Sequence, residues 1–185
     1  VLAVIILGTS LWSSIILFQQ KQAWKAYAAK KGLKYTANKF SESPTIEGEI
    51  EGFNISIFSG LQQKEDARKN RQLSVVQINA NTAFVDSLGA GTQEMFLFLK
   101  SLEAITPHEI KVGKWDKAYD IRSSNKGAVD AYLTEERVSI LTSILSMPKA
   151  DVLILLDGND GVFRVETSNP LQSEQILNSL VEKLM

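Results

Sequence analysis

The first 18 residues of this chain carry no charge, and eleven of them are Val, Leu, Ile or Phe. As a helix this segment would rise about 27 Å, slightly less than the roughly 30 Å hydrocarbon core of a bilayer. The apolar side chains favour insertion by about 5 kcal/mol in total, enough to offset the milder cost of Thr9, Ser10, Ser13 and Ser14. The segment predicts a membrane-spanning helix, and because the sequence begins at Val1 we expect the span to start a few residues earlier.

Two other interpretations of this segment remain open. A cleaved signal peptide would have a shorter apolar region and a small-x-small cleavage site. Ala26-Tyr27-Ala28 fits that site, but it lies among lysines, well past the apolar stretch. A helix in a protein core is rarely apolar on every face for about five turns. We therefore favour the membrane-spanning helix.

A cluster of six lysines from Lys21 to Lys39, with no acidic residue before Glu42, predicts the direction of the span. Basic residues beside a span stay on the cytoplasmic side. This predicts a single-pass membrane protein, with its N-terminus outside and its C-terminal domain cytoplasmic. We expect the helix to leave the membrane and to end at Gly32 in the left-handed conformation. The residues expected at the membrane interface are Lys21, Trp24, Lys25, Tyr27, Lys30 and Lys31.

Small residues recur along the apolar segment and suggest a packing surface. Ala3, Gly8, Ser10 and Ser14 form a stripe opposite larger side chains. Such stripes let two helices approach closely in lipid. The alternative is that these residues are tolerated in a solitary anchor.

About 150 residues follow the anchor, the size of one domain with a substantial core. The chain has no cysteine, which excludes a disulfide scaffold, thiolate metal sites and a cysteine nucleophile. Without the six lysines from Lys21 to Lys39, 14 of the 20 Lys and Arg remain against 21 Asp and Glu, so the rest of the chain has a net charge of −7. An acidic domain disfavours nucleic acid as a partner, despite the small basic group of Arg68, Lys69 and Arg71.

Alternating apolar residues predict a mainly antiparallel sheet. Residues 45–50 and 53–58 flank a tight turn at Glu51-Gly52, which indicates a hairpin. Its buried side is expected to hold Ile46, Ile50, Phe53, Ile55 and Ile57. Further strands are expected at 33–37, 73–78 and 109–112, with a break at Gly89-Ala90-Gly91, and residues 95–99 fit either a buried strand or the start of a helix.

The C-terminal third indicates helices and a second hairpin. A short helix is expected at 125–132, a second one capped by Thr134, and a last one from Asn169-Pro170. A hairpin is expected at 152–166. The fold class is therefore α+β: a transmembrane helix continuing into a basic juxtamembrane helix (1–31), then a single soluble domain with packed helices (32–185). Because hairpins recur at 45–58 and 152–166, two half-domains that share one sheet remain an alternative.

Few residues show the pattern of a catalytic or metal site. His108, the only histidine, follows Pro107 without an HExxH or GxSxG motif around it, so we expect a surface residue. Asp116 and Asp120 could act as an acid–base pair or hold a divalent ion, but no third ligand is evident. A polar edge around a buried Tyr119 is the simpler interpretation.

Two further runs contain glycines but lack the rest of a motif. The run from Asp157 to Gly161 begins like a calcium loop, but Gly161, Val162 and Ser168 occupy positions where the loop needs other residues, so we expect a turn. Gly89-Ala90-Gly91 lacks the third glycine and the Lys-Ser/Thr of nucleotide loops. We therefore expect no cofactor and no metal.

Four short stretches are similar to one family. They are AKKGLKY (29–35), PTIEG with Gly52 (44–52), VGKWDKAYDI (112–121) and AYLT with Arg137 (131–137). The chain resembles bacterial membrane-anchored proteins with a domain of unknown function of the DUF3137-like type. Their third stretch usually has Gly-Asp followed by Phe-Asp, whereas here Lys114 replaces the acid and only Tyr119-Asp120 keeps the aromatic–acid pair. The resemblance implies an α+β domain behind an anchor in the bacterial inner (plasma) membrane, and it brings no activity.

The leading hypothesis is a non-enzymatic accessory or interaction subunit of a larger inner-membrane complex, with energy-transducing (respiratory or photosynthetic) complexes as one form. Its partners would be other membrane subunits and the lipid bilayer. One alternative is a membrane-tethered enzyme that uses carboxylates such as Asp116 and Asp120. Another is a membrane-tethered domain that binds a small ligand or lipid headgroup, which would require a sizeable pocket.

Overall fold

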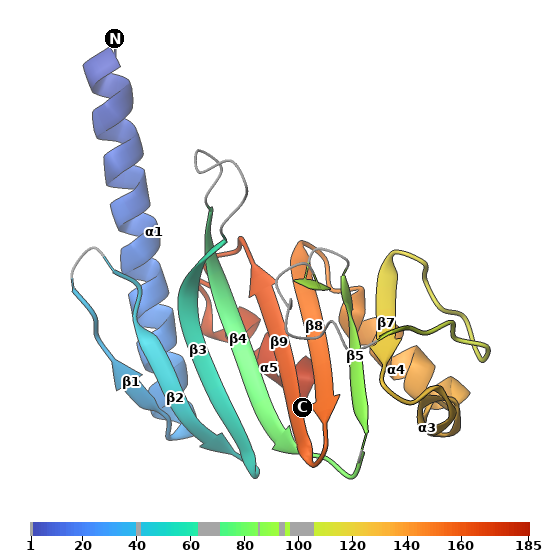
Figure 1. Ribbon diagram of the computed structural model, residues 1–185. Helices are drawn as coiled ribbons and strands as arrows, with labels where there is room; N and C mark the ends of the chain where they lie inside the picture. Colours follow the sequence, from blue (N-terminus) through green and yellow to red (C-terminus); the bar gives the residue numbers. More distant parts are fainter. Residues whose placement is uncertain (1, 40–41, 63–70, 85, 93–94, 97–105) are drawn as a thin grey trace. The chain divides into compact units, whose positions relative to one another are not determined.

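The computed structural model describes the chain except for residues 1, 40–41, 63–70, 85, 93–94 and 97–105, and except for the side chains of 2–10, 61–62 and 71 (Figure 1). In the described part the helices are α1 (Leu2–Lys31), α3 (Lys126–Tyr132), α4 (Glu135–Leu145) and α5 (Glu174–Leu184). The strands are β1 (Lys34–Thr36), β2 (Thr45–Ile50), β3 (Phe53–Gln62), β4 (Arg71–Asn81), β5 (Ser87–Thr92), β6 (Thr106–Pro107), β7 (Tyr119–Ser123), β8 (Ala150–Asp157) and β9 (Asp160–Thr167).

These elements confirm an α+β fold with a large antiparallel sheet. The hydrogen-bonded strand order is β1-β2-β3-β4-β9-β8-β5-β7-β6. Antiparallel registers are found for β1 with β2, β2 with β3, β5 with β7 and β8, and β6 with β7.

The chain divides into two compact units. Unit 1 comprises residues 1–76, 167–183 and 185, and unit 2 comprises residues 77–166 and 184. We expected a boundary after residue 31, but α1 contacts β1 and β2 and belongs with them to unit 1. Each unit contains one of the two hairpins noted in the sequence.

The first hairpin of unit 1 forms as expected. Strands β2 and β3 pair with Ile46 opposite Ile57 and Gly48 opposite Ile55. Glu51 and Gly52 both have positive φ angles, 52° and 86°, which is the geometry of the type I′ turn that suits twisted strands. Ile46, Ile55 and Ile57 are fully buried. Ile50 and Phe53, beside the turn, are only half-buried.

Helix α1 changes its surroundings along its length. Its C-terminal half packs into unit 1 through Gln20, Ala23, Trp24, Tyr27 and Ala28, a spacing that places them on one helix face. The helix then ends as expected at Gly32, whose φ is 70°. The amide of Leu33 donates to the carbonyl of Ala28 over 2.8 Å, the long-range bond of a Schellman cap.

The other half of α1 extends past the ends of β1 and β2 (Figure 1). Four of its large apolar side chains are exposed: Leu11, Trp12, Ile15 and Phe18. The prediction of an N-terminal helix is thus confirmed, whereas its location in a membrane stays a prediction.

Among the helices in the described part of the chain, none is long and apolar enough to cross a membrane.

Helix α5 begins later than we expected. Asn169-Pro170 was the predicted start, but the helix begins at Glu174. Before it, the side-chain oxygen of Asn169 accepts a hydrogen bond from the amide of Leu171 over 2.9 Å, which closes a local turn. Leu171 has a φ of 53°, outside the right-handed helical region, and its side chain is buried. This turn inserts Leu171 into the core and delays the helix.

Unit 2 contains both predicted helices. Asn125 caps α3 by accepting from the amide of Ala128, and Thr134 caps α4 by accepting from the amide of Arg137. Helix α4 packs against β5 and β8. Strands β8 and β9 form the predicted hairpin, and the turn between them includes Gly158 at a φ of 62°.

Two strand predictions in unit 2 are wrong, and one strand was missed. Gly89-Ala90-Gly91 is not a break but the middle of β5, which pairs on both sides. A Cβ atom on Gly91 would lie 2.7 Å from the carbonyl oxygen of Val152, so glycine permits a close approach of two strands there. The strand expected at 109–112 is absent, and the nearest strand before it is β6 at Thr106–Pro107. Strand β7 was not predicted. Most of residues 95–99 lie outside the described part.

Candidate functional site

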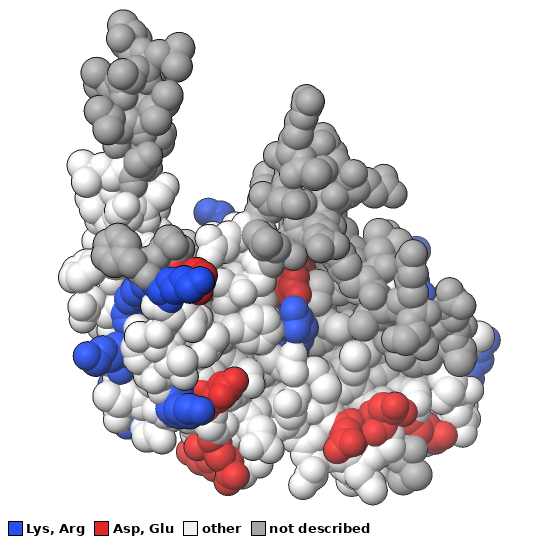
Figure 2. All heavy atoms as spheres, turned by 60° about the vertical axis from the view of Figure 1, so that its left-hand side comes forward, with Lys and Arg blue, Asp and Glu red and all other residues white. Residues whose placement is uncertain are grey.

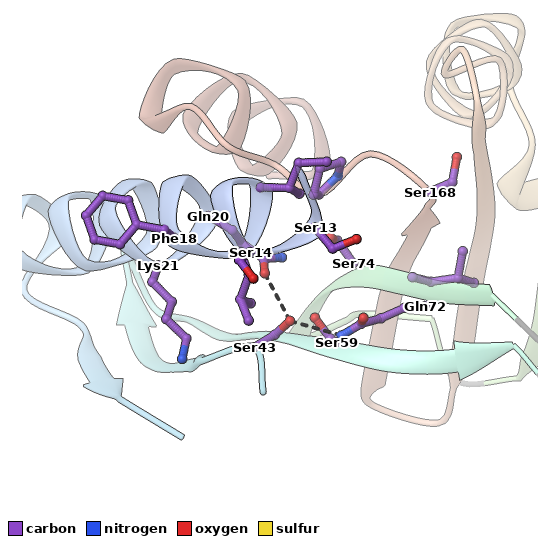
Figure 3. Close-up of a pocket in the computed structure, with 14 residues that line it drawn as sticks. Ser13, Ser14, Phe18, Gln20, Lys21, Ser43, Ser59, Gln72, Ser74 and Ser168 are labelled. Carbon is purple, nitrogen blue, oxygen red and sulfur yellow. Dashed lines mark hydrogen bonds between the residues drawn. The ribbon is translucent and has the colours of Figure 1, made fainter. Parts of the chain in front are cut away.

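A pocket of about 410 Å³ opens in unit 1 where α1 leaves the sheet (Figure 3). Its volume falls in the range of about 300–1,000 Å³ that is usual for small-molecule sites. Helix α1, strands β3 and β4 and the segments before β2 and after β9 supply its walls. The lining residues are Ser13, Ser14, Ile16, Leu17, Phe18, Gln20, Lys21, Ser43, Ser59, Gln72, Leu73, Ser74, Ser168 and Pro170.

A short hydrogen-bond network forms one wall of this pocket. The hydroxyl of Ser43 donates to the side-chain oxygen of Gln20 over 2.9 Å and accepts from the side-chain amide of Gln72 over 3.1 Å (Figure 3). The amide of Asn38 donates to the carbonyl of Ser43 over 2.7 Å. The network ties the helix to β4 and to the segment before β2, so the wall is pre-formed.

Other hydroxyls in the lining are available to a ligand. Within the described residues no side-chain hydrogen bond is found for Ser59, Ser74 or Ser168. Ser74 is buried, with 4% of its surface exposed. A serine hydroxyl can both donate and accept hydrogen bonds, so these three side chains can bond to a ligand or to water. Figure 3 labels Ser59, Ser74 and Ser168 among the side chains that line the pocket.

The charge of the lining is positive. Lys21 is the only charged residue among the described lining residues. Its ammonium donates to the carbonyl of Lys39 over 2.9 Å, which holds the side chain beside the pocket. The pocket therefore combines hydroxyls, amides and one cation with the apolar surface of Leu17, Phe18 and Leu73.

Below the pocket, α1 is locked against α5 and the turn before it. The indole N–H of Trp24 donates to the carbonyl of Leu171 over 3.2 Å, and Lys30 forms a 2.6 Å ion pair with Glu174. This hydrogen bond and the negative charge of Glu174 raise the pKa of Lys30. Burial, with a smaller contribution from the charge of Glu182, raises the pKa of Tyr27 to about 12.

These contacts correct two of the predicted membrane-interface residues. Trp24 and Tyr27 are fully buried in the protein, at 0% exposure, so they contact the core of unit 1 and not lipid. The reason is that α1 already packs on protein at this depth. The lysines remain at the surface: Lys25 and Lys30 are exposed, and Lys21 and Lys31 are half-buried. Figure 2 shows Lys and Arg side chains below the projecting part of α1, with Asp and Glu side chains interspersed.

The predicted helix-packing stripe is only partly described. Ser14 lines the pocket described above. The side chains of Ala3, Gly8 and Ser10 lie outside the described residues.

His108 is not the surface residue that we expected. Its side chain is 3% exposed, and its Nε2 lies 3.0 Å from the carboxylate of Asp130, which also contacts Lys111 at 3.4 Å. The backbone amide of His108 donates a 2.9 Å hydrogen bond to the carbonyl of Ile121 on β7. The Nδ1 atom of the ring has no partner within the described residues. Pairing with β7 thus draws the ring under the surface.

The Asp130 carboxylate is expected to stabilise unit 2 in a pH-dependent way. Desolvation raises the pKa of Asp130, but Lys111 and His108 together lower it by more than this. The pKa therefore lies below its ordinary value of 3.8. The resulting stability is fully present above pH 3.8 and is lost as the pH falls through the folded-state pKa. Asp130→Asn should lower the urea midpoint at pH 7, and the deficit should shrink below pH 3.8. Asp160→Asn, an exposed control, should show no such change; an equal Asp130→Asn deficit at both pH values would contradict the prediction.

The two carboxylates of the enzyme hypothesis make separate local contacts. Asp116 accepts from the amide of Ala118 over 2.9 Å, a local turn bond, whereas Asp120 lies on β7 and contacts Arg122 at 3.4 Å. In the described ranges, no group of three or more His, Cys, Asp or Glu side chains is placed to hold a metal ion. The Asp157–Gly161 run forms the β8–β9 turn.

Most of the pocket residues were missed in the sequence. They come from five separated segments, and no local motif joins them. One signal was present: Gln20 lies on the same helix face as Trp24 and Tyr27, which places a polar group among buried aromatic side chains.

Comparison of the sequence with protein-family models and with curated proteins finds no match. The resemblance to DUF3137-like proteins therefore stays a prediction.

Proposed function

We propose that this protein is a single-pass membrane protein whose folded part acts as a non-catalytic accessory or interaction subunit of a larger inner-membrane complex. One observation carries the proposal: Leu11, Trp12, Ile15 and Phe18 are 65%, 66%, 42% and 61% exposed on a helix whose other half is docked in unit 1. Contiguous exposed apolar surface of this kind is typical of contact with lipid or another protein. The uncharged sequence of residues 1–18 favours lipid.

The docked half of α1 supports an interaction role over a simple tether. Because Trp24, Tyr27 and the Lys30–Glu174 ion pair hold the helix in unit 1, the anchor is continuous with the folded part. Such an anchor presents the domain to membrane neighbours in a fixed orientation. The separation of Asp116 and Asp120 into different local contacts gives the enzyme hypothesis no support.

The anchor is tested by alkaline carbonate extraction of membranes. We expect the native chain to stay in the pellet and the Leu7→Lys/Leu11→Lys double variant to be released. Each lysine near the centre of a span costs about 2.5–3.5 kcal/mol, so the two together cost about 5–7 kcal/mol, which cancels the gain of about 5 kcal/mol from the apolar residues. Gln19→Lys, at the end of the segment, is the control and should stay in the pellet. Release of the native chain by carbonate would contradict the proposal.

The same preparation tests topology and partners. Since the chain has no cysteine, Ser146→Cys gives a single thiol on exposed surface for a membrane-impermeant maleimide. It should react in inverted vesicles and not in intact cells. In mild detergent the chain should elute from size exclusion with other membrane proteins. A monomer in both mild and harsh detergent would contradict the accessory-subunit role.

A further inference from the structure

The pocket beside α1 has the chemistry of a site for a polar, phosphate-bearing group. Ser59, Ser74 and Ser168 supply hydroxyls that make no side-chain hydrogen bond within the described residues, and the Gln20–Ser43–Gln72 network fixes the wall between them. Hydroxyls of this kind can donate to phosphate oxygens and accept from a ligand hydroxyl. The lining suits a ligand that carries both groups.

The charge around the pocket favours an anion. Lys21 is the one charged side chain among the described lining residues, and its position is fixed by the bond to the carbonyl of Lys39. An ammonium group binds phosphate as a point charge. With no carboxylate among the described residues of the lining, nothing there opposes a negative group.

The remaining lining residues are apolar and lead onto exposed apolar surface. Leu17 and Phe18 line the pocket, and Phe18 is also 61% exposed on the part of α1 that carries Leu11 and Ile15. A ligand with a polar head and apolar tails would therefore contact polar groups in the pocket and apolar groups along the helix. A soluble ligand would leave the apolar surface uncovered.

We propose that this pocket binds the hydroxylated phosphodiester headgroup of an anionic membrane lipid, whose acyl chains lie along the apolar face of α1. The proposal rests on the proposed membrane location, because the lipid reaches the pocket from the bilayer in which α1 is anchored. The headgroup of such a lipid is a glycerol phosphate, and a free phosphoester such as glycerol 3-phosphate carries the same groups.

The test measures binding to the purified full chain in an uncharged maltoside detergent by isothermal titration calorimetry. The probes are dihexanoyl-phosphatidylglycerol, dihexanoyl-phosphatidylcholine and glycerol 3-phosphate. We expect saturable binding of phosphatidylglycerol, at least about fivefold tighter than phosphatidylcholine and at least about tenfold tighter than glycerol 3-phosphate. Equal binding of glycerol 3-phosphate and the anionic lipid would overturn the lipid as the source of the ligand.

Two serines of one strand give a matched pair of variants. Ser59 lines the pocket, whereas Ser56, three positions earlier on β3, lies on the opposite face of the strand. Ser59→Leu should fill the pocket and weaken phosphatidylglycerol binding at least about tenfold, and Ser56→Leu should leave it unchanged. Near-UV circular dichroism checks that both variants fold.

A second variant keeps the proposal testable if Ser59→Leu does not fold. Lys21→Gln should remove the preference for phosphatidylglycerol over phosphatidylcholine. Unchanged lipid preference in Lys21→Gln, or unchanged binding in a folded Ser59→Leu variant, would overturn the site. Because binding is measured in detergent and insertion by carbonate extraction, failure of the pocket and failure of the anchor give separate results.

Discussion

Replacing Trp24 by Ala should lower the free energy of unfolding by about 3–5 kcal/mol, the usual cost of emptying a buried aromatic site. Trp24 is fully buried between α1 and the rest of unit 1, and its indole N–H bonds to the carbonyl of Leu171 over 3.2 Å. The variant loses the packing of the indole ring and its hydrogen bond to Leu171. Urea unfolding in uncharged detergent, followed by near-UV circular dichroism, measures the change.

Trp12 provides the matched control on the same helix. It is 66% exposed, so Trp12→Ala removes an equal side chain from a site with few protein contacts. We expect a change within about 0.5 kcal/mol, as for other surface substitutions. Equal losses in the two variants would show that α1 is not docked through Trp24 as described.

Gly91→Ala should destabilise unit 2 by about 1–3 kcal/mol, the usual cost of overpacking a core. The added Cβ would lie 2.7 Å from the carbonyl oxygen of Val152, and a backbone atom cannot turn away as a side chain can. Strands β5 and β8 would have to separate, which weakens their hydrogen bonds. Thermal unfolding followed by circular dichroism measures the loss.

Gly127→Ala is the control, and we expect it to raise the stability that Gly91→Ala lowers. Gly127 lies in α3, and its Cβ would meet the Asn125 side chain at 3.6 Å, an ordinary contact. Since alanine favours a helix over glycine, this variant should gain about 0.5–1 kcal/mol. A Gly91→Ala variant as stable as Gly127→Ala would contradict the close strand approach.

The sequence predicted those elements whose signals are local. The Glu51-Gly52 turn, the Thr134 cap and the Gly32 helix end each depend on residues within a few positions, and all three formed as expected. The alternating isoleucines of the first hairpin identified its buried side for the same reason. Such features need no knowledge of the rest of the fold.

Features that depend on distant residues could not be predicted in this way. Gly89 and Gly91 looked like a break because glycine is unfavourable in strands, but the close approach of the β8 backbone requires glycine at position 91. Trp24 and Tyr27 looked like interface residues because they follow an apolar segment, yet both are fully buried, and Trp24 bonds to Leu171, which lies 147 positions away in the chain. The pocket is the extreme case, since its serines come from segments that only the fold brings together.

The unbroken course of α1 gives the protein a mechanical property. The helix runs from Leu2 to Lys31, and its last turns are fixed in unit 1. At about 1.5 Å per residue, Leu2 lies some 35 Å along the helix from the docked aromatic residues. A tilt of about 10° at the base would therefore move the tip by about 6 Å. Because one helix carries both the docked and the projecting residues, a small reorientation of the folded part is enlarged at the other end of the helix.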